Sequence, residues 1–213
     1  MPANFNHIAR LYRYLEYLTL GPILQRTRTH FLSHLLDRKQ ALVLGDGDGR
    51  FLAQLLKTNL GIHADAVDTS ATMLQLLRQR CETTVHSATH RLHTHNHSAL
   101  EHAVSRKTDL ITTHFFLDCL TQTELETLIA KLSSHLASGT LWLHSDFRIP
   151  TGLLNLPGRL YIRILYFAFR LLTGLRTTHL PDHEAPLQQA GFQRTHQHLS
   201  LFGLLTTELW ERT

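Results

Sequence analysis

Residues suited to nucleotide binding gather between Ala41 and Phe51, in the sequence ALVLGDGDGRF. The apolar residues at the start of this segment predict a short buried strand, and apolar residues at helical spacing follow it. Between them, Gly45, Gly47 and Gly49 let the backbone turn tightly and bring its N–H groups close to a ligand, because no Cβ intervenes. A strand, a glycine-rich turn and the start of a helix predict a nucleotide-type binding site.

Charged residues around this turn indicate which nucleotide it holds. Asp46 and Asp48 would repel a pyrophosphate but suit a sulfonium that carries an α-ammonium group. Arg50 stands where a dinucleotide-binding turn has its third small residue. Asp68, about 20 residues after the last glycine, can accept hydrogen bonds from both ribose hydroxyls, which suits NAD equally. The pattern favours a sulfonium nucleoside, and an NAD(P)-dependent oxidoreductase is the alternative.

Strand and helix patterns alternate along the chain. Helices are predicted over 5–36 in two parts, 50–58, 71–81, 121–136 and 181–190, and strands over 41–44, 64–68, 84–88, 109–115, 140–146, 192–199 and 204–211. This order implies a mostly parallel sheet with helices on both faces, in which the last two strands are antiparallel because their connection is tight. We expect one α/β domain over 1–213, with 1–38 as an N-terminal helical cap.

Composition fits a soluble globular protein with a sizeable core, since 43% of its 213 residues are apolar and 18% are charged. The net charge of +4 is mild and scattered, so no nucleic-acid partner is expected. Cys81 and Cys119 cannot form a disulfide framework, and the N-terminus lacks the pattern of a signal peptide. These features favour a cytoplasmic protein.

A strongly apolar stretch runs from Leu153 to Leu175, and Arg159, Arg163 and Arg170 interrupt it. A central arginine costs about 2.5–3.5 kcal/mol in a membrane-spanning helix, so this stretch is not expected to cross a bilayer. At helical spacing the three arginines lie within about 40° of one another and form one stripe of an amphipathic helix. We expect 152–176 to be a helical insertion that acts as a lid or lies on a membrane surface.

Four segments within about 41–146 resemble the class I S-adenosylmethionine-dependent methyltransferases. Besides the glycine turn, these are VDTSATML (67–74), DLITTHFFLD (109–118) and LASGTLWL (136–143), which are similar to the family's motifs at the second, fourth and fifth strands. The chain's opening FNHIARLY is similar to the start of ubiquinone/menaquinone-type methyltransferases. The resemblance implies a Rossmann-like, doubly wound seven-stranded sheet that ends in an antiparallel hairpin, with S-adenosyl-L-methionine as cofactor.

The resemblance also implies which residues bind the cofactor. Asp68 would hold the ribose, and Thr69 and Met73 would flank the adenine, although Met73 fits core packing equally well. The cofactor-binding residues implied in this way are Gly45, Asp46, Gly47, Gly49, Asp68, Thr69, Met73, Ser87, Ala88, His114 and Phe115.

Two positions depart from the family pattern. Val43 replaces an acid before the glycine turn, for which Asp46 is a substitute, and Ser87 and Ala88 replace an acid after the third strand. These departures allow a second alternative, a non-catalytic S-adenosylmethionine-binding partner protein.

His114 and Asp118 are the candidate catalytic residues. His114 suits a general base or a lining residue, and Asp118 suits a substrate contact or the first turn of a helix. Tyr12, Tyr161 and Tyr166 are candidate substrate contacts. Together with the apolar insertion, they predict a small lipophilic or aromatic acceptor, held near the methyl group by in-line placement.

Histidines are frequent between 86 and 102, where His93, His95 and His97 alternate. Alternate histidines on a strand would share one face, which is the arrangement that a metal ion requires. The segment lacks the aspartate of the hydrolase pattern H-x-H-x-D-H, and the chain is rich in histidine throughout. We therefore interpret it as a solvated loop and expect no metal.

Overall fold

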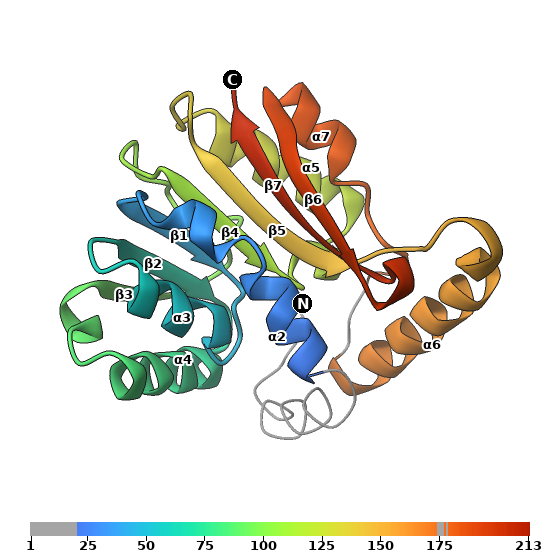
Figure 1. Cartoon of the computed structure of the whole chain (residues 1–213), viewed down its shortest axis with the longest axis horizontal. Helices are drawn as coiled ribbons and strands as arrows, with labels where there is room; N and C mark the ends of the chain where they lie inside the picture. Colours follow the sequence, from blue (N-terminus) through green and yellow to red (C-terminus); the bar gives the residue numbers. More distant parts are fainter. Residues whose placement is uncertain (1–20, 174–176, 178) are drawn as a thin grey trace.

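One mixed sheet of seven strands forms the centre of the protein, in the order β3-β2-β1-β4-β5-β7-β6 (Figure 1). The computed structural model describes residues 21–173, 177 and 179–213. The strands are β1 (Gln40–Leu44), β2 (His63–Asp68), β3 (Leu92–Asn96), β4 (Leu110–His114), β5 (Leu141–Phe147), β6 (Phe192–Ser200) and β7 (Leu205–Arg212). The first five pair in parallel, and β7 is antiparallel to both β5 and β6. The predicted doubly wound sheet with an antiparallel hairpin is confirmed.

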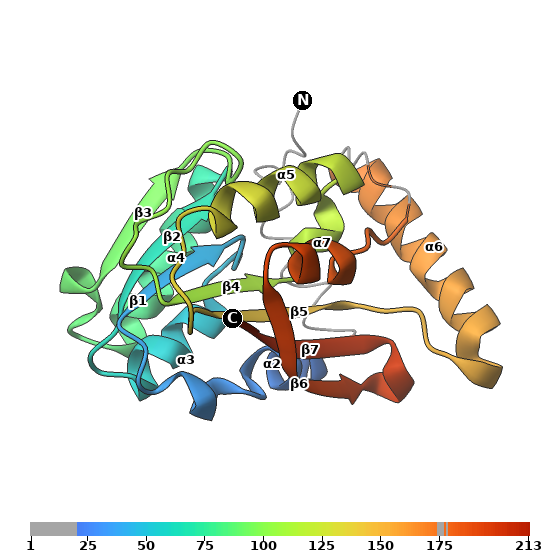
Figure 2. The same cartoon turned by 90° about the horizontal axis from the view of Figure 1, so that it is seen from above.

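Helices cover both faces of this sheet (Figure 2). The α-helices of the described chain are α2 (Gly21–Thr29), α3 (Arg50–Thr58), α4 (Ala71–Thr84), α5 (Gln122–Ser133), α6 (Asn155–Thr173) and α7 (Glu184–Gln189). Alternate residues of β1 face opposite ways, so Ala41 and Val43 pack with α3 and α4, whereas Leu42 and Leu44 pack with α5 and α7. Residues of β1 are therefore buried from both sides, which explains its continuous apolar sequence.

Local sequence signals fix several of the helix ends. The side chain of Ser70 accepts a hydrogen bond from the Met73 amide and caps α4. Thr121 and Glu124 form a reciprocal capping box at the start of α5. Both helices follow strands that run parallel to β1, so β2 and β4 finish at the same edge of the sheet.

The third strand was expected at 84–88, and this prediction is wrong. Val85 ends α4, since its amide donates to the Cys81 carbonyl, and a short 3-10 helix at Ala88–His90 follows. The strand is β3, which has the polar sequence LHTHN and lies at the edge of the sheet. An edge strand is half exposed to solvent, so it requires little of the apolar pattern on which the prediction relied.

Arg91 anchors the start of this edge strand. Its buried guanidinium donates to the carbonyls of Leu56, Asn59 and Ile62, which lie at and just after the end of α3. These hydrogen bonds tie the start of β3 to the end of α3, in addition to the pairing of β3 with β2 and the burial of Leu92.

Of the two further helical regions, α2 lies against α3 and the β5–β7 part of the sheet, whereas α6 lies along one end of the molecule (Figure 1). Of the predicted cap over 1–38, the structure describes α2 and a 3-10 turn at Leu32–Leu35, whereas 1–20 lie outside the described residues. The predicted insertion consists of a 3-10 turn at Gly152–Leu154 and the long helix α6. None of the described helices combines the length and the apolarity that crossing a bilayer requires.

Candidate functional site

The glycine turn leaves β1 with three residues in the left-handed region, where φ is 66° at Gly45, 58° at Gly47 and 79° at Gly49. A Cβ at Gly45 would clash with the ring of Phe116, and one at Gly49 would lie 2.8 Å from Leu77 Cγ. A Cβ at Gly47 would meet nothing within 4 Å. Gly45 and Gly49 therefore allow close packing, and Gly47 faces the open space in which a ligand fits.

Asp46 holds the start of the following helix. Its Oδ2 accepts a hydrogen bond of 2.9 Å from the Leu52 amide, so the carboxyl group caps α3. Its Oδ1 is buried and has no hydrogen-bond partner in the described chain. Burial raises the pKa of Asp46 to about 7, so this group is partly protonated at neutral pH.

Asp48 is paired with arginines, which corrects the expectation of two free carboxylates in the turn. Its carboxylate lies 3.1 Å from Arg50 Nε and 2.6 Å from Arg80 Nη2. Arg80 also donates to the Asp48 carbonyl. The sequence argument missed these contacts because Arg80 reaches the turn from α4. The two arginines thereby neutralise the negative charge of Asp48. Repulsion between this turn and a pyrophosphate is therefore weaker than the sequence predicted, and it no longer distinguishes a sulfonium nucleoside from NAD(P).

Asp68 ends β2 beside the glycine turn, in the predicted place. Its Oδ1 accepts a hydrogen bond of 2.8 Å from the Ser70 amide, and burial raises its pKa to about 6. Thr69 next to it is exposed, whereas Met73 is buried in the packing of α4. The position fits an acceptor for ribose hydroxyls at the end of a parallel strand.

Ser87 and Ala88 are not at this edge, because they precede β3 instead of following it. Ala88 is part of the core, and Ser87 Oγ accepts a hydrogen bond from Arg91. Their assignment to the cofactor therefore loses its basis. The residue that ends β3 next to Asp68 is Asn96, whose side chain donates to the Asp68 carbonyl.

His114 and Phe115 lie where β4 ends. Both ring nitrogens of His114 are buried without a hydrogen-bond partner in the described chain, and its ring centre lies 4.2 Å from that of Phe51. Burial, together with the nearby Arg28, lowers its pKa well below the usual value, so the ring is neutral. Phe115 has a left-handed backbone with φ of 54°, a strained conformation of the kind found at binding sites.

Two buried carboxyl groups, those of Asp118 and Asp146, lie together after β4 and at the end of β5. The Asp118 amide donates to Asp146 Oδ2 at 3.1 Å, so the two residues are direct neighbours. Burial raises the pKa of Asp118 to about 6, and burial and the neighbouring Asp118 hold that of Asp146 well above its usual range. Because neighbouring buried carboxyls disfavour each other's ionisation, this pair retains a proton more readily than isolated carboxyls do.

The sequence pattern did not single out Asp146 as a functional residue, although its strand was predicted correctly. The signal was present, because a polar residue that ends a strand next to β4 must lie near the residues that follow β4. This rule follows from the fact that neighbouring parallel strands end at the same edge of a sheet. Applied to the predicted strand 140–146, it would have placed Asp146 beside Asp118.

Helix α6 closes the outer side of this carboxyl pair. The Tyr166 hydroxyl donates to the Asp118 carbonyl at 3.0 Å, and Ile162 packs with Phe147 and Leu204. Tyr166 is buried, as a residue near the acceptor should be, whereas Tyr161 is 38% exposed on another side of the helix. Tyr12 lies outside the described residues.

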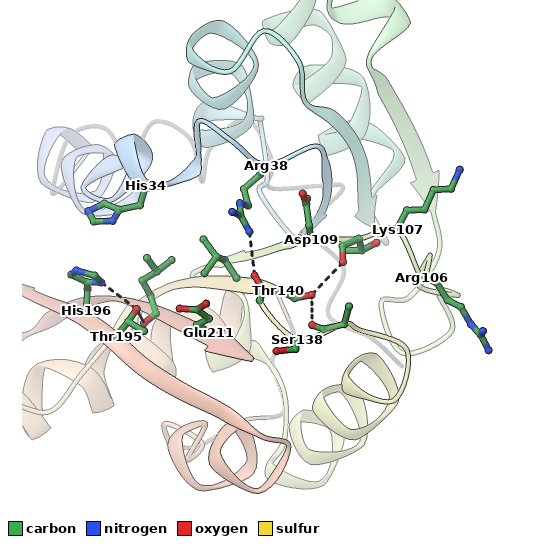
Figure 3. Close-up of a pocket in the computed structure, with 15 residues that line it drawn as sticks. His34, Arg38, Arg106, Lys107, Asp109, Ser138, Thr140, Thr195, His196 and Glu211 are labelled. Carbon is green, nitrogen blue, oxygen red and sulfur yellow. Dashed lines mark hydrogen bonds between the residues drawn. The ribbon is translucent and has the colours of Figure 1, made fainter. Parts of the chain in front are cut away.

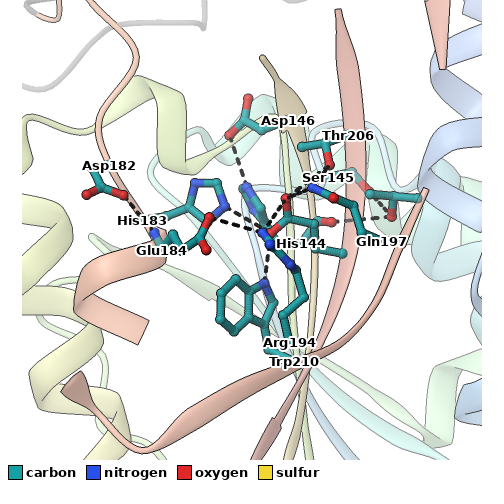
Figure 4. Close-up of polar contacts among 12 residues, drawn as sticks. His144, Ser145, Asp146, Asp182, His183, Glu184, Arg194, Gln197, Thr206 and Trp210 are labelled. Atoms are coloured by element: carbon teal, nitrogen blue, oxygen red, sulfur yellow. Dashed lines mark hydrogen bonds and ion pairs between the residues drawn. The ribbon is translucent and has the colours of Figure 1, made fainter. Parts of the chain in front are cut away.

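A polar network around Glu208 lies next to Asp146 on the α7 side of the sheet (Figure 4). Glu208 accepts hydrogen bonds from Trp210 and Gln197, and lies 3.1 Å from His183 Nε2. Burial opposes ionisation of Glu208, but the hydrogen bond from His183 and the nearby histidines hold its pKa below the usual range. Because its partners are all internal, we interpret this network as structural.

A cavity of about 630 Å³ opens at the opposite edge of the sheet, away from the ends of β1, β2 and β4 (Figure 3). It lies where β4 and β5 begin, near Arg38, Asp109 and Thr140. The carboxylate of Asp109 accepts hydrogen bonds from the amides of Lys39 and Gln40, and Arg38 donates to the Gly139 carbonyl. Its polar groups thus tie loops together, and none of the predicted cofactor residues lines it.

The histidine-rich segment forms an edge strand and the loop after it, which corrects its interpretation as a loop throughout. His95 Nε2 lies 2.9 Å from Asp65 Oδ1, and His97 hydrogen-bonds His102. In the described part of the chain, no group of three or more histidine, cysteine or acidic side chains is arranged to hold a metal ion.

The carboxyl ends of β1, β2 and β4 thus present groups that fit a nucleoside with a charged amino group. Gly47 borders open space, Asp68 offers a carboxylate, and Asp46 Oδ1 and both nitrogens of His114 lack partners within the described chain. Unpartnered buried polar atoms are uncommon in folded proteins and suit a site that a ligand completes. The residues present therefore fit the cofactor that the sequence implies.

Comparisons with known proteins agree with this arrangement. Residues 42–141 match the family model described as a methyltransferase domain. No curated protein matches the chain. Similar solved structures have the same doubly wound fold, which confirms the predicted fold.

Three of these structures illustrate the likeness. The mitomycin 7-O-methyltransferase MmcR is 13% identical with a TM-score of 0.70 over 98% of this chain. An O-methyltransferase family 2 protein from Planctomyces limnophilus, in complex with apigenin, is 19% identical with a TM-score of 0.70 over 94%. CalO1 with bound SAH, a methyltransferase in calicheamicin biosynthesis, is 14% identical with a TM-score of 0.67 over 98%. This chain spans 60–61% of the length of these proteins.

The raised pKa of Asp46 predicts how stability depends on pH in the absence of ligand. From about pH 4 to pH 7 the folded chain keeps a proton that the unfolded chain releases, so the free energy of unfolding falls as the pH rises. Asp46→Asn retains an acceptor for the Leu52 amide but removes the charge. We expect it to raise the free energy of unfolding by on the order of 2–4 kcal/mol at about pH 8, and by roughly half as much at about pH 5.

Urea denaturation at the two pH values measures this difference. Asp37→Asn is the matched control, because the Asp37 side chain is 68% exposed and its substitution should change stability little. An Asp46→Asn variant that is less stable than the wild type at the higher pH would contradict the prediction, because it would show that the folded protein stabilises the charged carboxylate.

Proposed function

Because residues 42–141 match the model of a methyltransferase domain, we propose that the protein transfers a methyl group from S-adenosylmethionine to a small lipophilic or aromatic acceptor. The observation that carries the proposal is the joint placement of Gly47, Asp68 and His114 at the carboxyl ends of three adjacent strands. Open α/β sheets bind nucleotides at that edge.

The chain's own residues would hold the cofactor in distinct ways. The turn at Gly47 leaves room for close approach of the ligand to the backbone, and Asp68 would accept hydrogen bonds from the ribose. Two polar groups at this edge of the sheet lack hydrogen-bond partners within the described chain, Asp46 Oδ1 and the neutral ring of His114. Asp46 Oδ1 would bind the amino acid portion of the cofactor, and the His114 ring would line its site. When bound, the cofactor supplies a methyl group on a sulfonium, which is already activated for transfer.

Asp118 and Asp146 are the groups that we assign to the acceptor. An acceptor hydroxyl must lose its proton on methylation, and the ionised member of the carboxyl pair can take it. The pKa of about 6 at Asp118 suits a base that works near neutral pH, and Asp146 keeps it in position through their hydrogen bond. His114 lacks the basicity for this role at neutral pH, because its pKa is lowered well below the usual value.

The surroundings of the carboxyl pair favour an apolar acceptor. Phe115 and Phe147 lie with ring centres 5.3 Å apart, and Tyr166 with Ile162 packs against Phe147 from α6. Such walls exclude water and bind aromatic or aliphatic surface. The Planctomyces limnophilus protein of the same fold binds apigenin, an acceptor class that these walls suit.

Calorimetric titration tests the cofactor assignment. We expect S-adenosylmethionine to bind and NAD(P) not to bind, and we expect Asp68→Ala to weaken binding by tens to hundreds of fold, since a hydrogen bond to a charged group is worth roughly 1.5–3 kcal/mol. The control is Asp65→Ala, on the same strand but bonded to Gln40 and His95. Binding of NAD(P) alone would favour an oxidoreductase, and equal affinity in Asp68→Ala would refute the ribose contact.

Substitution in the carboxyl pair tests the acceptor side. With labelled S-adenosylmethionine and apigenin as the first acceptor, Asp118→Asn should lower kcat by roughly 10²–10⁴-fold, the usual contribution of a general base. Binding of S-adenosylhomocysteine should stay unchanged, because the pair does not hold the cofactor. Asp37→Asn again provides a surface control. Unchanged turnover in Asp118→Asn would exclude the pair as the proton acceptor, and cofactor binding without turnover of any acceptor would favour a partner protein.

A further inference from the structure

Helix α6 presents an apolar stripe to solvent that the proposed reaction does not use. Leu156 is 78% exposed, Leu160 59%, Ile164 60% and Phe167 63%. At 100° per residue these four side chains lie within about 80° of one another on the helix. Isolated exposed apolar residues are normal, whereas a continuous stripe of large ones marks an interaction surface.

Arginines line one edge of this stripe. Arg159, Arg163 and Arg170 are all exposed, and they occupy a band of about 40° between the apolar stripe and the buried face. The helix sequence NLPGRLYIRILYFAFRLLT contains no acidic residue. The outward surface of α6 therefore combines apolar side chains with positive charge only.

The position of α6 leaves this surface accessible. Its opposite face packs on the domain through Ile162 and Tyr166, and the helix lies along one end of the molecule (Figures 1 and 2). The tip of the β6–β7 hairpin lies at the same end and carries Phe202, which is 83% exposed with φ of 55°. Leu153, just before α6, is 99% exposed.

We propose that this outward surface of α6 docks on an anionic lipid membrane, with the helix axis parallel to the bilayer plane. The apolar stripe would enter the boundary between headgroups and acyl chains, and the arginines beside it would lie at the level of the phosphates. This is the arrangement of interfacial amphipathic helices, which lie in the surface and do not cross. Each arginine near an anionic surface adds to the attraction.

Charge complementarity selects a lipid surface over a second copy of the chain. Two copies that met through α6 would bring bands of arginine close to each other, and the helix offers no carboxylate to pair with them. Anionic headgroups supply the complementary charge at every point along the helix. Membrane docking does not depend on methyl transfer, so this proposal is tested independently of the proposed function.

Vesicle sedimentation of the full chain tests the proposal. The wild type should sediment with vesicles of phosphatidylcholine mixed with an equal part of phosphatidylglycerol, and much less with phosphatidylcholine alone. Binding should weaken as salt rises, since screening reduces the attraction. The double variant Leu160→Glu/Phe167→Glu should lower the partition coefficient at least about tenfold, because charged residues replace the inserted side chains. Arg159→Glu/Arg163→Glu should remove the preference for anionic vesicles.

Leu60→Glu is the matched control, because Leu60 is a 74% exposed leucine in the turn between α3 and β2. It should bind vesicles as the wild type does, and circular dichroism checks that all variants fold. The proposal would be overturned if the wild type did not bind anionic vesicles, or if Leu60→Glu lost as much binding as Leu160→Glu/Phe167→Glu. Light scattering that shows a dimer lost in Leu160→Glu/Phe167→Glu, without vesicle binding, would also overturn it and assign the surface to a second copy.

Discussion

The close approach between the turn after β1 and its neighbours is the constraint on which the rest of the site depends. At Gly45 the backbone passes against the ring of Phe116, and at Gly49 it passes against Leu77 of α4. Neither position has room for a Cβ, and both have a positive φ. The turn is thereby held against the exits of β2 and β4, so that Gly47 faces open space beside Asp68 and His114. Any larger turn would separate these groups.

Burial of acids at this one edge of the sheet is the second organising feature. Asp46, Asp68, Asp118 and Asp146 all have raised pKa values, and burial is the main cause for each. Buried carboxyls weaken a fold unless something compensates their charge. A ligand that carries positive charge supplies such compensation, which is the electrostatic reason to favour a sulfonium with an amino group. The preference for a positively charged ligand thus rests on Asp46 together with acids outside the turn, and no longer on Asp48.

The sequence predicted the helices and strands well where apolar periodicity is strong. It predicted them less well where polar contacts determine the position of an element. The segments around β1, α3, β2 and α4 follow their patterns because both faces of the central strands are buried. Strand β3 was misplaced because an edge strand anchored by Arg91 needs no apolar pattern. The pairing of Asp48 with Arg80 joins residues about 30 positions apart and has no local sequence signal, whereas that of Asp118 with Asp146 follows only from the order of the strands.

The central claim is that the glycine turn and Asp68 hold the cofactor at the carboxyl edge of the sheet. Hydrogen–deuterium exchange with and without S-adenosylhomocysteine tests it directly, because amides close to the ligand exchange more slowly when it binds. Protection should centre on Gly45 to Gly49 and on Asp68 and Thr69. Protection confined to the cavity around Arg38 and Asp109, at the opposite edge, would contradict the account.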